Sequence, residues 1–103
     1  MTAEEWRELG EAIVVWCRMD VVEPRRFSAD RLSSRFGTDC VARLLPQLEG
    51  FANEFYKSDA WLRPTLSPLE QQRAAEQEFA ERYPDMPLEA VRALGQNYAF
   101  DYK

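Results

Sequence analysis

Residues 28–56 read SADRLSSRFGTDCVARLLPQLEGFANEFY and hold the densest apolar pattern of the chain. Ser28 can act as the N-cap of a short helix, and Gly37 suits the left-handed backbone that closes one. Thr38 or Asp39 then offers a second N-cap, after which apolar residues recur every three or four positions. These residues are Val41, Leu44, Leu45, Leu48, Phe51, Ala52 and Phe55. The stretch predicts a short helix, a glycine turn and a longer helix.

Pro46 lies inside the longer of these two predicted helices. A proline in a helix lacks the backbone N–H and presses its ring on the carbonyl four residues earlier, here that of Ala42. We therefore expect either a kink or a break into two helices, with Pro46 in the first turn of the second.

The N-terminal segment has the pattern of an amphipathic helix. Thr2 and Glu5 have the T-x-x-E spacing of a capping box, in which each side chain bonds the backbone N–H of the other residue. Apolar residues follow at helical spacing, at Trp6, Leu9, Ile13 and Trp16. We expect this helix to end near Met19 or Asp20.

A second capping box marks a helix in the C-terminal half. Ser67 is a suitable N-cap, Pro68 fits the first helical position, and Glu70 stands three residues after the cap. We expect this helix to run to about Tyr83, with Glu78 and Arg82 as a surface ion pair.

The end of the chain leaves several conformations open. Asp85 can cap a last helix with Leu88, Val91 and Leu94 as its buried side, and Gly95 is a candidate end. The sequence NYAFDYK, residues 97–103, then alternates in the manner of a strand. The helix continues through Gly95, the aromatic tail docks on the body, or the tail pairs with another chain. We favour docking within the protein.

These patterns predict an all-α fold. A chain of 103 residues with 46% hydrophobic residues suits a single domain, residues 1–103, formed by a bundle of four or five helices with an aromatic C-terminal tail. The expected core consists of Trp6, Ile13, Trp16, Leu32, Phe36, Leu44, Leu48, Phe55 and Phe79.

The residues needed for common enzyme chemistry are scarce. The chain has no histidine, so Ser-His and Cys-His nucleophile pairs are excluded. Two cysteines, Cys17 and Cys40, stand in apolar patterns and are expected to be buried thiols rather than a disulfide. We expect no enzyme activity, no metal site and no cofactor. The acidic N-terminus and the short apolar runs favour a cytoplasmic protein without membrane contact.

The charge of the chain is acidic overall and basic in one region. The net charge is −5, yet residues 24–46 carry a net +3 from five arginines against two aspartates. The arginines are Arg25, Arg26, Arg31, Arg35 and Arg43. They allow a helix-turn-helix DNA-binding regulator as an alternative function. Against it, the second helix begins with Asp39, which repels phosphate, and has Arg43 as its only cation. The arginines would otherwise solvate a helix face and pair with the acidic remainder of the chain.

Aromatic residues in segments expected at the surface favour a binding function. They are Trp61, Tyr98, Phe100 and Tyr102, and such residues are common interface anchors. Trp61 either packs over the helices or faces a partner. The leading hypothesis is a non-enzymatic module that binds another, possibly basic, protein: an acidic inhibitor, an immunity- or antitoxin-like protein, or a small regulatory subunit. A homo-oligomeric or phage-type structural component is a further class, and nucleic acid is the less favoured partner.

Overall fold

The computed structural model of the chain describes residues 1–17 and 29–101, with Ala29, Phe100 and Asp101 described by their backbone alone. These residues form five α-helices and one 3-10 helix, η1. Their bounds are α1 Ala3–Cys17, α2 Ala29–Phe36, α3 Thr38–Tyr56, η1 Ala60–Leu62, α4 Pro68–Arg82 and α5 Leu88–Asp101. No strand occurs in the described ranges. The predicted all-α bundle is confirmed.

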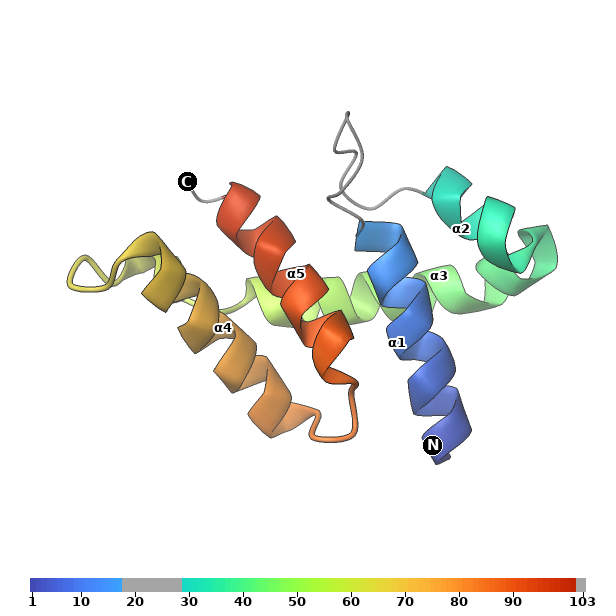
Figure 1. Cartoon of the computed structure of the whole chain (residues 1–103), viewed down its shortest axis with the longest axis horizontal. Helices are drawn as coiled ribbons and strands as arrows, with labels where there is room; N and C mark the ends of the chain where they lie inside the picture. The colour runs from blue at the N-terminus through green and yellow to red at the C-terminus, as the bar shows by residue number, and fades with distance from the viewer. Residues whose placement is uncertain (18–28, 102–103) are drawn as a thin grey trace.

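Three helices lie side by side across a fourth. Figure 1 shows α1, α5 and α4 in one layer, with α3 running across behind them. α3 contacts each of these helices, and α2 packs against α1 and α3. α1 and α5 run in the same direction, while α4 runs opposite to α5 (Figure 1). In this layer α5 lies between α1 and α4 and contacts both.

The apolar faces of all five α-helices meet in one core. Its largest fully buried apolar side chains are Ile13, Leu32, Leu44, Leu48, Phe55, Phe79, Val91, Leu94 and Tyr98. Trp16 is also buried, whereas Trp6 and Phe36 pack against the core with part of their surface exposed. The expected core is therefore confirmed for most of its members, and α5 adds residues to it.

Both predicted capping boxes are present. At α1, the Glu5 N–H donates to Thr2 Oγ1 at 3.2 Å, and the Thr2 N–H donates to Glu5 Oε1 at 3.1 Å. At α4, the Glu70 N–H donates to Ser67 Oγ at 3.2 Å, and the Ser67 N–H donates to Glu70 Oε1 at 3.0 Å. Pro68 occupies the first turn of α4 as predicted.

The glycine turn and the proline of the central stretch both differ in detail from the expectation. Gly37 has φ 86° and ψ 156° and is itself the N-cap of α3, so Thr38 begins the helix and no side chain caps it. The helix then runs unbroken through Pro46, so of the two expected alternatives, a kink or a break, the break is wrong. Pro46 and Ala42 are exposed, where water can bond the carbonyl that lacks its helical donor. Ser28 lies outside the described residues.

The C-terminal segment is helical as far as Asp101, which confirms the alternative that the helix continues through Gly95 and not the favoured one of a separate docked tail. α5 continues through Gly95 to Asp101, and Val91, Leu94 and Tyr98 form its buried face at steps of three and four. Gly95 does not end the helix. It is buried where a Cβ would collide with the carboxylate of Glu76, so its small size permits close packing of α5 on α4.

The start of α5 is also later than predicted. The helix begins at Leu88, because Asp85 lies in a turn closed by the Met86 N–H donating to the Tyr83 carbonyl at 3.0 Å. Leu88 itself is 56% exposed, so its predicted place on the buried side is wrong. A residue in the first turn has fewer neighbours from the adjoining helices than Val91 one turn later.

Side chains of two other helices satisfy the C-terminal carbonyls of α1. Arg31 of α2 donates to the carbonyls of Val15 at 3.0 Å and Trp16 at 2.7 Å. Asn97 of α5, which is fully buried, donates to the carbonyl of Cys17 at 3.0 Å. The last carbonyls of a helix have no partner within it, so these bonds fix α2 and α5 against the end of α1.

We expect Arg31→Met to lower the free energy of unfolding by about 2 kcal/mol, the usual loss for hydrogen bonds from a charged donor. Methionine keeps much of the aliphatic stem but cannot bond the α1 carbonyls. Urea denaturation followed by tryptophan fluorescence measures the change. Arg35→Met is the matched control, because Arg35 is exposed on the same helix. Equal midpoints for the two variants would contradict a clamping role of Arg31.

The two cysteines are free thiols with different surroundings. Cys17 is buried as predicted, and burial raises the pKa of its thiol to about 12, although Arg31 opposes the shift. Cys40 is only partly buried, which corrects the expectation for it.

At pH 8 we expect a disulfide reagent to modify Cys40 rapidly in the folded protein and Cys17 only after unfolding in urea, because the thiolate is the reactive form. Rapid loss of both thiols without urea would disprove this difference, and Cys40→Ser is the control.

Candidate functional site

The connection between α3 and α4 folds into a short ordered turn. The Leu62 N–H donates to the Asp59 carbonyl at 2.9 Å and the Arg63 N–H to the Ala60 carbonyl at 3.1 Å, which forms η1. Ala60 is fully buried and anchors this turn on the body. The turn therefore has a defined position despite its lack of a sequence period.

A buried tyrosine of α5 holds the backbone of this turn. The Trp61 N–H donates to Tyr98 Oη at 2.9 Å, and the Tyr98 hydroxyl donates to the Ser58 carbonyl at 3.3 Å. The ring of Tyr98 packs edge-on against Phe55 and Tyr56, with centroid distances of 5.6 and 5.8 Å. Tyr98 is 1% exposed, so the expectation that it lies in a surface segment is wrong. Its hydroxyl positions Trp61 instead.

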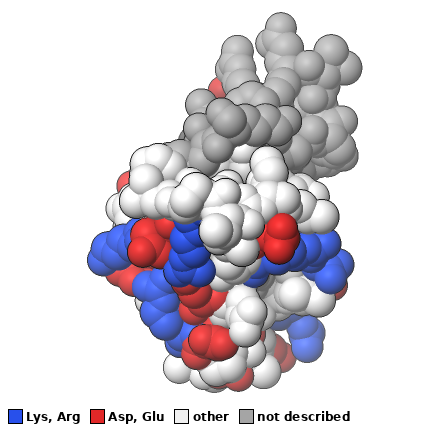
Figure 2. Space-filling model, turned by 90° about the vertical axis from the view of Figure 1, so that its left-hand side faces the viewer, with Lys and Arg blue, Asp and Glu red and all other residues white. Residues whose placement is uncertain are grey.

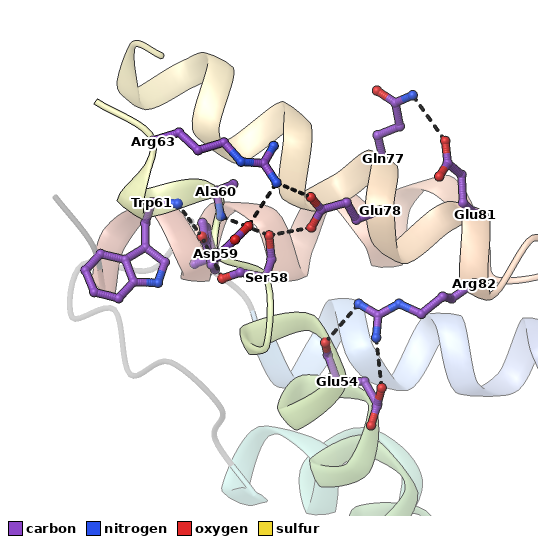
Figure 3. Close-up of polar contacts among 11 residues, drawn as sticks. Glu54, Ser58, Asp59, Ala60, Trp61, Arg63, Gln77, Glu78, Glu81 and Arg82 are labelled. Atoms are coloured by element: carbon purple, nitrogen blue, oxygen red, sulfur yellow. Dashed lines mark hydrogen bonds and ion pairs between the residues drawn. The ribbon is translucent and has the colours of Figure 1, made fainter. Parts of the chain in front are cut away.

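Charged side chains brace the same turn against α4 (Figure 3). Ser58 Oγ donates to Glu78 Oε2 at 2.6 Å, and Arg63 Nη2 lies 2.8 Å from Glu78 Oε1 and 2.9 Å from Asp59 Oδ1. Hydrogen bonds to Glu78 and then Asp59 raise the pKa of Arg63 above its ordinary value. Glu78 thus joins both ends of the turn to one helix.

Arg82 of α4 pairs with α3 rather than with Glu78, so the predicted surface pair within α4 is wrong. Its Nη1 lies 2.9 Å from Glu54 Oε2, as Figure 3 shows. Lys57 lies 2.7 Å from the other oxygen of Glu54. The hydrogen bond from Lys57, with a smaller contribution from Arg82, lowers the pKa of Glu54. Arg63 pairs with Glu78 and Arg82 with Glu54 across different elements, and the spacing of residues within α4 does not reveal either pair.

Three exposed hydrophobic side chains belong to this turn and to the start of α4. Among the described residues five large hydrophobic side chains are exposed, and three of them come from η1 and the first turn of α4, which contact each other. They are Trp61 at 40%, Leu62 at 61% and Leu69 at 59% exposed, and we call them the η1 patch. Figure 2, which views this end of the molecule, shows interspersed acidic and basic residues with an uncharged area above them.

The predicted partner-binding residues differ in their exposure to solvent. Trp61 was expected either to pack over the helices or to face a partner, and its side chain is 40% exposed on η1. Tyr98 is buried beneath it. Phe100 belongs to the last turn of α5, and its side chain is not described; Tyr102 lies outside the described residues. Leu62 and Leu69 were missed as surface residues. Leu62 stands in a segment without periodicity, so no pattern separates an exposed leucine from a buried one there.

Two of the three predicted DNA-binding arginines that the structure describes, Arg31 and Arg43, bond other helices of the protein. Arg31 bonds the carbonyls of α1, and Arg43 Nη2 lies 2.9 Å from Glu8 Oε1. The bond to Glu8 raises the pKa of Arg43. Arg35 is exposed, with its guanidinium 5.5 Å from the ring centroid of Phe36. The remaining two, Arg25 and Arg26, lie outside the described residues. Nucleic-acid binding stays a prediction.

Neither the described side chains nor known proteins point to a particular chemistry. In residues 1–17 and 29–101, no group of three or more His, Cys, Asp or Glu side chains is placed to hold a metal ion. In the same ranges, no helix has the length and apolarity that crossing a bilayer requires. In comparisons with known proteins, no protein-family model, curated protein or solved structure matches the chain.

We expect Tyr98→Phe to loosen the turn that carries Trp61. The substitution keeps the buried ring but removes the acceptor of the Trp61 N–H and the donor to the Ser58 carbonyl. The loss should reduce the free energy of unfolding by about 1–2 kcal/mol. Amide hydrogen exchange at Trp61 should accelerate more than exchange in the middle of α3. Unchanged protection of the Trp61 amide would show that the hydroxyl does not hold the turn; Tyr83→Phe, which removes a tyrosine hydroxyl beside Phe79 and away from η1, is the control.

Proposed function

We propose that the protein is a non-enzymatic module that acts by binding another protein through the η1 patch. The observation that carries the proposal is the exposure of Trp61 and Leu62 on a turn that Tyr98 of α5 and Glu78 of α4 hold in place. We place its action in the cytoplasm, where free thiols such as Cys17 and Cys40 persist. It would work as an acidic inhibitor, an immunity- or antitoxin-like protein, or a small regulatory subunit.

The exposed patch has the chemistry of an interface centre. Tryptophan buries a large apolar surface and is enriched among the residues that dominate binding energy. Leu62 and Leu69 supply apolar surface from the same two elements. Burial of such side chains by a partner is favourable, at about 25 cal/mol for each Å² of apolar surface removed from water.

The braced turn also favours binding through its low ordering cost. Association loses free energy when a mobile loop must be fixed, by about 0.5–1.5 kcal/mol for each flexible side chain. The bonds from Tyr98, Glu78 and Arg63 already fix the turn before a partner arrives. Their role in function would therefore be to position Trp61 in advance.

The acidic charge of the chain favours a basic partner. A net charge of −5 attracts cationic surfaces and accelerates their encounter. Asp59 and Glu70, close in sequence to Trp61 and Leu69, are exposed. A partner with apolar side chains surrounded by lysine or arginine would match this surface.

We expect Trp61→Ala combined with Leu62→Ser to weaken partner binding by at least about tenfold while the melting temperature stays nearly unchanged. The tagged chain and the double variant are used in parallel to capture proteins from a lysate of the source cells, with and without nuclease, and the recovered proteins are identified by mass spectrometry. The affinity of the purified partner for both forms is then measured by calorimetry.

Leu88→Ser is the matched control, because Leu88 is 56% exposed, close to the 61% of Leu62, but lies at the start of α5. A partner that survives nuclease, binds the control and is lost by the double variant would support the proposal. Equal binding by the double variant and the control would refute the assignment of the site. A large loss of melting temperature in the double variant would show that Trp61 is part of the core.

A further inference from the structure

We draw no further inference here: the strongest candidate, the hollow of about 360 Å³ on α1 whose apolar lining comes from Val14, Val15 and Pro87, is bordered by charged side chains of both signs, and nothing in the structure shows what covers it.

Discussion

The carbonyl groups at the C-terminal end of α1 need hydrogen-bond donors that the helix itself lacks, and meeting this need organises the bundle. Arg31 and Asn97 supply the donors, so α2 and α5 both end up against α1. Asn97 also donates to the carbonyl of Ala93 at 3.0 Å, whereas its buried Oδ1 atom has no hydrogen-bond partner among the described residues. One unmet acceptor is the cost of holding α1 and α5 together at this point.

The same turn of α5 connects the core to the η1 patch. Asn97 bonds α1, and the next residue, Tyr98, bonds the turn that carries Trp61. Two adjacent side chains of α5 thus form hydrogen bonds with two different elements, α1 and the η1 turn. The position of Trp61 is therefore set by the packing of the whole layer of α1, α5 and α4, and not only by the residues of the turn.

Local patterns were sufficient for the helices and most of the core, because capping boxes and apolar spacing act within a few residues. They failed where a contact joins distant parts of the chain. The alternation of Tyr98, Phe100 and Tyr102 resembled a strand, yet α4 and α1 impose a helix whose buried face includes Tyr98. The partners of Glu78 and Arg82 likewise come from other elements. Trp61 could be selected as a candidate binding residue because it is aromatic and stands in a segment expected at the surface. The hydrogen bonds that hold its turn could not be predicted, because they come from Tyr98 and Glu78 of other elements.

Gly95 determines how a buried carboxylate is accommodated between α4 and α5. A Cβ at residue 95 would collide with the carboxylate end of Glu76, so the side chain of Glu76 lies directly against the backbone of α5. Glu76 is only 6% exposed, and its Oε2 accepts a hydrogen bond from Gln72 Nε2 at 2.8 Å. Any side chain at position 95 would therefore have to displace a buried carboxylate rather than an apolar group, so the cost of enlarging this residue would be electrostatic as well as steric.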